Sequence, residues 1–119
     1  MLPGRLRPLD AKHDPRWRVI FDVGYFVDTD PDPVWEFIQR WGVHRSEDLR
    51  AAIGCCLLEH LLQFHFRRYF PRVRQLAREN ARFAFVAGMC SEFGQARIPA
   101  NTRRLRRLKS DIKRWHPRR

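Results

Sequence analysis

Cys56, His60 and Cys90 are the residues whose types could hold a metal ion. Cys56 and His60 are four residues apart, which places them on one helix face, and Cys90 could complete a three-ligand zinc site. However, the sequence contains no Cys-x-x-Cys or His-x-x-x-His pair, and Cys56 and His60 lie within an apolar stripe. Because free cysteine behaves as a small hydrophobe, we expect these cysteines and Cys55 to be packed inside, with no bound metal.

Glu59 and His60 together suggest acid–base chemistry. Neighbouring residues of a helix point about 100° apart, so these two side chains would not face one substrate. We expect Glu59 to pair with an arginine such as Arg68 or Arg72, or to lie in solvent. No Ser-His-Asp order, glycine-rich phosphate loop or zinc-protease motif is found in the sequence. The sequence therefore predicts no enzyme, no catalytic residue and no cofactor.

Asp28, Asp30 and Asp32 have the one-three-five spacing of a calcium-binding loop. Such a loop needs a glycine at its sixth position and a glutamate at its twelfth, where this chain has Pro33 and Gln39. Helix capping explains these aspartates better. Asp32 is predicted to cap a helix whose first residue is Pro33.

The elements that would position these residues are helices. Residues 17–27 are β-branched and aromatic enough for a strand, but no partner strand follows, so we expect a helical turn or an extended segment there. Four helix boundaries are predicted from capping and breaking residues: Ser46 as N-cap of the central helix, Pro71 as the start of a third helix that bends at Asn80, Gly94 as a left-handed stop, and Asn101 as N-cap of a helix ending at Trp115.

Hydrophobic spacing predicts the sides of these helices that face the core. Along the central helix we expect Ile53, Leu57, Leu61 and Phe64 to be buried. In the last helix one stripe should pack inward, and its members are Leu105, Leu108, Ile112 and Trp115. The sequence thus predicts an all-α fold, a compact bundle of about five helices.

The domain organisation follows from length and composition. A chain of 119 residues has room for one domain, and 44% hydrophobic residues suffice for one core. We expect an extended arm over residues 1–16, a single helical domain over 17–115 and a tail over 116–119. No apolar run is long enough for a membrane span, and the N-terminus lacks the apolar stretch of a secretory signal. We expect a cytoplasmic protein without a membrane partner.

The net charge of +11, from 24 Lys and Arg against 13 Asp and Glu, indicates attraction to polyanions. Residues 97–119 hold ten Lys and Arg against one acid. The predicted nucleic-acid-binding residues are Arg103, Arg104, Arg106, Arg107, Lys109, Lys113 and Arg114, with Arg67 and Arg68 in a second cluster that Arg72, Arg74 and Arg78 extend. Only Trp115 interrupts the basic helix, so contacts to the phosphate backbone are favoured over base stacking.

A resemblance accompanies these patterns. Asp32-Pro-Val-Trp, a glycine turn and Ser46-Glu-Asp-Leu-Arg-Ala-Ala-Ile resemble the two helices of a HEAT-type unit. Leu57-Leu-Glu-His-Leu-Leu, Phe70-Pro-Arg-Val, Phe93-Gly-Gln-Ala and Pro99-Ala-Asn are similar to small uncharacterised bacterial helical proteins of HEAT-like character. The resemblance covers roughly residues 30–105. It implies stacked helical hairpins and a binding role.

Two functions remain open from the sequence. The first is a non-catalytic accessory protein that contacts the backbone of RNA or DNA through its basic C-terminal helix, as a subunit of a larger nucleoprotein complex. The alternative is a helical protein–protein interaction adaptor whose arginines meet an acidic protein partner.

Overall fold

The computed structural model describes residues 15–117, and this part of the chain is built from helices without a strand. The α-helices are α1 (Pro15–Gly24), α2 (Pro31–Trp41), α3 (Glu47–Ile53), α4 (Glu59–Glu79), α5 (Ala81–Gly88) and α6 (Pro99–Trp115). A π-helical turn, η1 (Gly54–Leu58), joins α3 to α4, and a 3-10 helix, η2 (Gly94–Arg97), precedes α6. The predicted all-α bundle is confirmed, with six α-helices in the described part.

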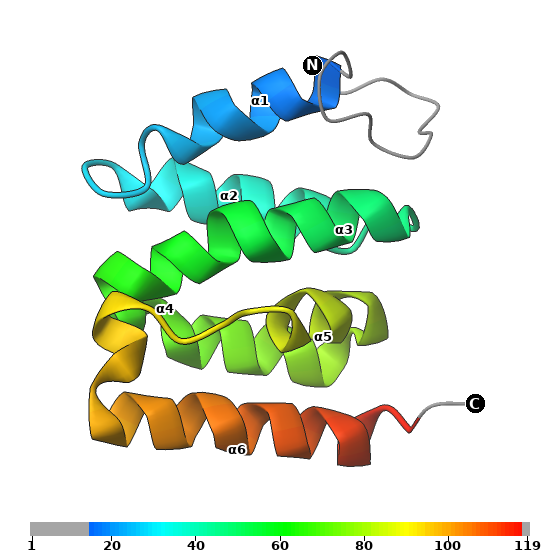
Figure 1. Ribbon diagram of the computed structural model, residues 1–119. Coiled ribbons are helices and arrows are strands. Elements are labelled where there is room, and N and C mark those ends of the chain that lie inside the picture. Colours follow the sequence, from blue (N-terminus) through cyan, green and yellow to red (C-terminus); the bar gives the residue numbers. More distant parts are fainter. Residues whose placement is uncertain (1–14, 118–119) are drawn as a thin grey trace.

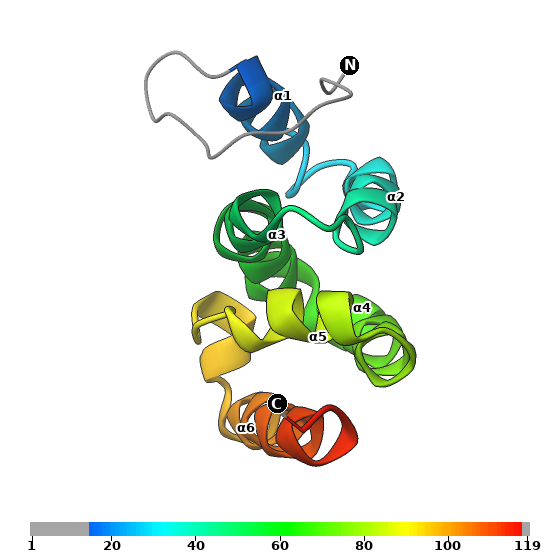
Figure 2. The ribbon, with the colours of Figure 1, turned by 90° about the vertical axis from the view of Figure 1, so that its right-hand side faces the viewer.

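The helices are stacked in layers, with α1 at one end of the stack and α6 at the other (Figure 1). The view from the side shows the same order, with α1 and α6 at opposite ends (Figure 2). α1 contacts α2 and η1, whereas α6 contacts α4, α5 and η2. As the last element of the stack, α6 has one side on the core and the opposite side free of other helices.

Apolar side chains from all six α-helices form one core. The predicted core residues Ile53, Leu57 and Leu61 are fully buried, but Phe64 is 40% exposed and that prediction was wrong. Phe64 directly precedes His65, where the backbone of α4 is non-helical, and the buried residues that follow are Phe66, Tyr69 and Phe70. Within residues 15–117, no helix combines the length and the apolar character that crossing a bilayer requires.

The segment of residues 17–27 is neither a strand nor an extended stretch. Most of it belongs to α1, which begins at Pro15, two residues inside the predicted arm. The rest of the arm, residues 1–14, lies outside the described residues. Ile20 and Val27 are buried, so tertiary packing selects a helix here despite the β-branched composition.

Of the three predicted N-caps, Asp32, Ser46 and Asn101, only Ser46 is confirmed. The Ser46 side chain accepts a hydrogen bond from the Leu49 N–H at 3.3 Å and so caps α3. At α2, Asp32 is not the cap, because the helix already begins at Pro31 and Asp30 holds the N-cap position without a side-chain bond. Asp32 bonds instead to residues of α4.

Pro71 does not open a helix; it lies inside α4. The break in this region is at His65, whose backbone is non-helical (φ −139°, ψ 44°). Gln95 of η2 bridges this kink: its side-chain oxygen accepts from the Phe66 N–H at 2.9 Å, and its amide nitrogen donates to the Phe64 carbonyl at 2.7 Å. The kink thus leaves these two backbone groups satisfied.

The predicted interruption at Asn80 is confirmed, because α4 ends there. Asn80 also caps α5, which was not predicted: its side chain accepts from the Phe83 N–H at 3.0 Å. Gly94 has the predicted left-handed backbone, with φ +52°. It does not stop a helix, however. α5 ends at Gly88, and Gly94 opens η2.

Candidate nucleic-acid interface

The basic helix begins earlier than predicted. α6 starts at Pro99, with Ile98 in the N-cap position, so the prediction of Asn101 as N-cap was wrong. Proline suits the first turn because it lacks the N–H that would have no partner there. The Asn101 side chain lies inside the first turn, where it donates to the Gln95 carbonyl at 3.0 Å and accepts from Arg104 at 3.0 Å.

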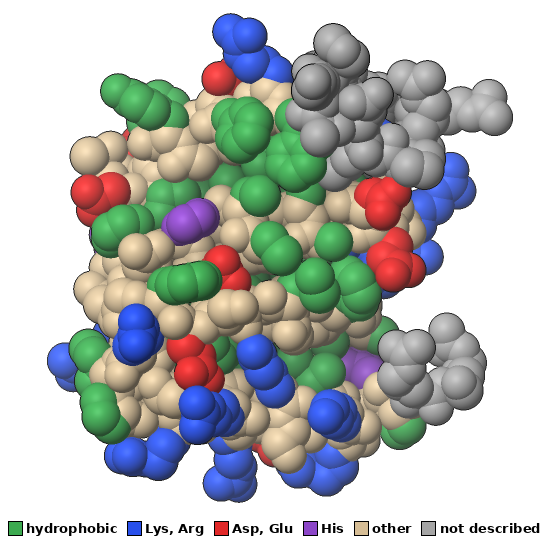
Figure 3. Space-filling view, in the orientation of Figure 1, with side chains coloured by type: hydrophobic (Ala, Val, Ile, Leu, Met, Phe, Trp, Pro, Cys, Tyr) green, Lys and Arg blue, Asp and Glu red, His purple; other side chains and the backbone are tan. Residues whose placement is uncertain are grey.

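One stripe of α6 packs inward, as its spacing predicts. Leu105 and Leu108 are buried, and Ile112 and Trp115 are partly buried against the core. Cations occupy most of the remaining circumference. In the space-filling view, Lys and Arg side chains gather over α6, while hydrophobic side chains are more frequent over the upper helices (Figure 3).

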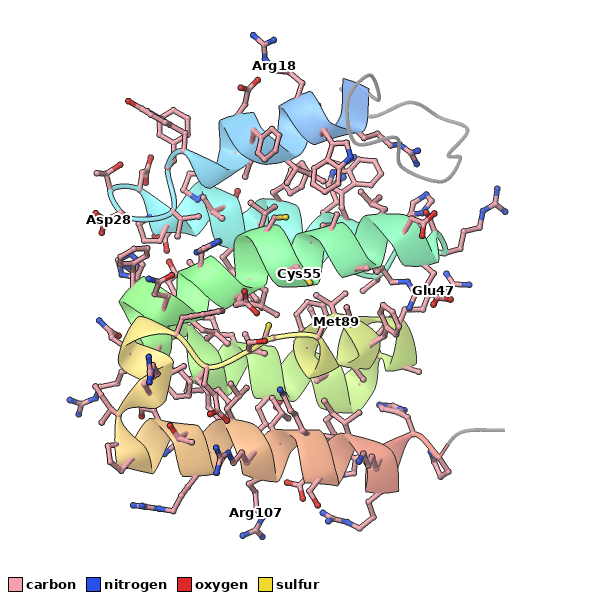
Figure 4. All side chains as sticks on the ribbon, in the orientation of Figure 1. Arg18, Asp28, Glu47, Cys55, Met89 and Arg107 are labelled. Atoms are coloured by element: carbon pink, nitrogen blue, oxygen red, sulfur yellow. The ribbon has the colours of Figure 1, made fainter. Side chains whose placement is uncertain are left out.

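The cations on the outward side of α6 form two rows. Arg103, Arg107 and Arg114 are separated by four and seven residues, so they lie within about 40° of one another around the helix axis. Arg106 and Lys113, seven residues apart, form a neighbouring row. All five side chains are exposed. Arg107 projects away from the stack at the end opposite Arg18 (Figure 4).

Some of the nine predicted binding residues form ion pairs and others do not. Four are paired with carboxylates: Arg106 with Glu92 at 2.8 Å, Arg68 with Asp32 at 2.9 Å, and Arg107 and Arg114 with Asp111 at 3.8 and 2.9 Å. The other five form no ion pair within residues 15–117; they are Arg67, Arg103, Arg104, Lys109 and Lys113. Hydrogen bonding from Arg106 holds the pKa of Glu92 below its ordinary value.

The structure brings Arg67 to the basic helix but not Arg68. Arg67 and Arg104 flank a groove of about 730 Å³ between α4 and the start of α6, whose apolar lining includes Phe70 and Ile98. Arg68 turns toward α2, where it bonds to Asp32. The second predicted cluster is therefore split between two sides of α4.

Tyr69 is the centre of the contacts between α4 and α2. Its hydroxyl donates to the Asp32 carboxylate, and the guanidinium groups of Arg68 and Arg72 lie 5.3 and 5.4 Å from its ring centre. Burial and the bond to Asp32 raise the pKa of Tyr69 to about 12, and the same hydrogen bond lowers the pKa of Asp32. Asp32 thus ties two helices together instead of capping one.

The sequence reasoning missed Asp111 as an organising residue. It read this aspartate as the only acid of a basic segment, yet the side chain is 2% exposed and accepts from Arg74 of α4 at 3.0 Å. The spacing of Arg107, Asp111 and Arg114, four and three residues, would have indicated one helix face. The contact with Arg74 spans 37 residues and has no local signal.

The cysteines and His60 are not brought together. Cys55 is exposed and Cys56 half-buried, so the expectation of buried cysteines holds only for Cys90. The Cys90 thiol donates to the Gly54 carbonyl at 3.7 Å, and burial raises the pKa of this thiol. His60 is exposed on its helix. The described residues contain no group of three His, Cys, Asp or Glu side chains placed to hold a metal ion.

Glu59 has a different partner from the one predicted. Its carboxylate is nearly buried and accepts from the Ser91 N–H at 2.6 Å, so it binds the segment after α5 rather than Arg68, Arg72 or solvent. This bond satisfies a backbone N–H and fixes the chain between α5 and η2.

Comparisons with known proteins find no matching family model, no similar curated protein and no similar solved structure. The resemblance to HEAT-type helical proteins stays a prediction from the sequence.

Proposed function

We propose that this protein is a non-catalytic accessory protein of the cytoplasm that binds the phosphate backbone of nucleic acids through the outward side of α6. The observation that carries the proposal is the charge of this helix: seven Lys and Arg against one Asp, with that Asp buried. The exposed surface of the helix is therefore almost purely cationic. Such a single-sign surface is what counterion release from nucleic acid requires.

The spacing of the outward rows suits a phosphate backbone. With a rise of about 1.5 Å per residue, Arg103 and Arg107 are about 6 Å apart along the helix axis, and Arg107 and Arg114 about 10 Å. Phosphates of one DNA strand recur every 3.4 Å or so along the duplex axis, so these arginines can reach several of them at once. Because phosphate contacts carry no base information, binding should depend little on nucleic-acid sequence.

The test is a matched pair of triple variants in duplex DNA and structured RNA binding. Arg103→Gln, Arg107→Gln and Lys113→Gln remove three exposed charges from α6. The control, Arg18→Gln, Arg40→Gln and Arg45→Gln, removes three exposed charges near the other end. We expect the α6 variant to flatten the slope of log affinity against log salt by about three units, one per lost contact, and to weaken binding to unrelated sequences equally.

The control variant should keep the wild-type slope within about one unit. Equal losses in both variants would mean that the net charge of the molecule, not α6, attracts the nucleic acid. A wild-type protein without measurable affinity for duplex DNA or structured RNA at low salt would refute the proposal.

A second candidate is the protein–protein adaptor. It is favoured by the aromatic surface at the other end of the stack, where Phe21 of α1 and Tyr25 of the following turn are 62% and 82% exposed. Exposed aromatic residues in one place are typical of protein interaction surfaces. If nucleic acid does not bind, the α6 variant should instead weaken binding to an acidic polypeptide, for which poly-glutamate is the probe.

A further inference from the structure

Asp111 is a buried carboxylate surrounded by exposed arginines. Its side chain is 2% exposed, whereas those of Arg74, Arg107 and Arg114 are 43%, 80% and 66% exposed. The nearest nitrogens of these arginines lie 3.0, 3.8 and 2.9 Å from its oxygens. The buried carboxylate therefore pairs with the three guanidinium groups on their protein-facing side, and the rest of each guanidinium group stays exposed to solvent.

The ring of Trp115, four residues after Asp111 in the sequence, contacts two arginines of α4. The guanidinium of Arg74 lies 4.9 Å from the ring centre of Trp115, and that of Arg78 lies 5.7 Å from it. The following residue, His116, donates from Nε2 to the Ala77 carbonyl at 2.8 Å, which fixes the end of α6 against α4. Residues of two helices thus form one cluster at this seam, which we call the Asp111 cluster: Arg74, Arg78, Arg107, Asp111, Arg114 and Trp115.

The Asp111 cluster has an excess of positive charge. It contains four guanidinium groups and one carboxylate: three of the arginines pair with Asp111, and the fourth, Arg78, lies over Trp115 and forms no ion pair within the described residues. Each guanidinium carries five N–H donors in a planar fork. Arg74 uses one nitrogen toward Asp111 and one face toward Trp115, so donors remain for an external acceptor.

We propose that the Asp111 cluster is a binding site for a phosphate group of the nucleic-acid backbone, with Asp111 and Trp115 as positioning residues. The inference rests on the proposed function and adds two arginines of α4, Arg74 and Arg78, to the interface. Arg107 and Arg114 belong both to this cluster and to the outward side of α6, so the two surfaces are continuous. Planar guanidinium groups held in fixed positions bind phosphate oxygens in pairs, which freely moving side chains do less well.

A purely structural role explains less of the arrangement. One ion pair, Arg74 with Asp111, is enough to join α4 to α6. Arg107 and Arg114 lie on the same helix as Asp111 and add nothing to that connection. Arg78 stacks on Trp115 from α4 while most of its donors stay in solvent. A phosphate group bound between α4 and α6 would be a common partner for these additional cations.

The chain offers a matched control for Arg78. Arg40 of α2 is also exposed and also lies over a tryptophan, 5.6 Å from the ring centre of Trp41. Arg78→Gln and Arg40→Gln each remove one positive charge and one arginine–tryptophan contact. Only the first removes a cation from the Asp111 cluster. Both variants should melt like the wild type, because both side chains are on the surface.

The first measurement is the affinity for a short DNA duplex as a function of salt. We expect Arg78→Gln to weaken binding roughly fivefold and to lower the salt slope by about one unit, and Arg40→Gln to change the affinity less than about twofold. If the duplex binds the wild type and both variants lose the same amount, the phosphate site is refuted while the proposed function stands.

The second measurement uses inorganic tripolyphosphate without nucleic acid. Titration should shift the indole N–H resonance of Trp115 in the NMR spectrum and leave that of Trp41 in place, with the Trp115 signal assigned from Trp115→Phe. Arg78→Gln should abolish the shift. A Trp115 shift in a protein that does not bind duplex supports the site and refutes the proposed function; no shift, or equal shifts at both tryptophans, refutes the site.

Discussion

At the scale of residues, Asp111 shows how the cationic surface is held in place. A hydrogen bond from Arg74 and the nearby positive charge of Arg114 keep the pKa of its carboxyl group below the ordinary value, although burial acts in the opposite direction. The folded protein therefore binds a proton at this group less readily than the unfolded chain does. The ion pairs stabilise the fold above about pH 4, the unfolded pKa, and this contribution is lost as the pH falls through the folded pKa.

Asp111→Asn should make this dependence visible. At pH 7 we expect the variant to unfold at a lower urea concentration than the wild type, because the arginines lose their common anion. The difference should shrink as the pH falls below about 4, since the unfolded wild-type chain then binds a proton at Asp111 that the folded protein binds less readily. Asp28→Asn, at an exposed carboxylate without an ion pair, serves as the control and should have little effect. A difference between Asp111→Asn and wild type that stays constant down to pH 3 would contradict this account.

At the scale of elements, the sequence predicted what local chemistry decides. Ser46 caps a helix as predicted, because an oxygen next to free N–H groups is a local arrangement, and the helix before Asn80 is interrupted there as predicted. The spacing of residues alone likewise predicted the side of α6 that packs inward and the cations on its remaining sides. The exposed cations of α6, which are the proposed binding residues, could therefore be named from the sequence.

Elements that depend on distant contacts could not be predicted in this way. α1 is helical because Ile20 packs into the core, although its residues favour a strand. Asp32 does not cap a helix, because its carboxylate accepts a hydrogen bond from the hydroxyl of Tyr69, 37 residues away. The grouping of Arg74 with Asp111 spans the same distance in sequence, so the α4 part of the proposed interface depends on how α4 and α6 meet.

η2 shows the same dependence at the kink of α4. Gln95 bonds both sides of the break at His65, and this requires Gly94 to approach the chain closely. A Cβ atom at Gly94 would lie 2.7 Å from the Gln63 carbonyl oxygen, which real contacts do not allow. Gly94 also has φ +52°, a backbone conformation that costs other residues about 1–2 kcal/mol.

Gly94→Ala should therefore lower the free energy of unfolding by at least about 1–2 kcal/mol, measured by urea denaturation. Gly88→Ala is the matched control. Gly88 is the last residue of α5, its φ is not positive, and a Cβ atom there would meet nothing within 4 Å. That substitution should be neutral or stabilise the protein by up to about 1 kcal/mol. Equal effects of the two substitutions would show that η2 does not hold the kink of α4.

At the scale of the whole molecule, the two ends of the stack differ in surface chemistry. Lys and Arg side chains gather over α6 (Figure 3), whereas Phe21 of α1 and Tyr25 of the following turn are exposed at the other end. α1 and α6 are separated by the layers of α2 to α5 and do not contact each other. The division suits the proposed function, in which one end binds nucleic acid while the other remains available to a protein partner.

The division predicts that the two ends can be altered independently. Phe21→Ser with Tyr25→Ser should reduce the fluorescence of Nile red, an uncharged apolar dye, and leave duplex affinity within about twofold of wild type, since effects at distant sites are independent. The α6 variant Arg103→Gln, Arg107→Gln, Lys113→Gln should do the reverse. Combining all five substitutions should give the sum of the two free-energy changes. If the Phe21→Ser, Tyr25→Ser variant weakens duplex binding more than the α6 variant does, the nucleic acid binds at the α1 end of the stack. That result would contradict the proposed function.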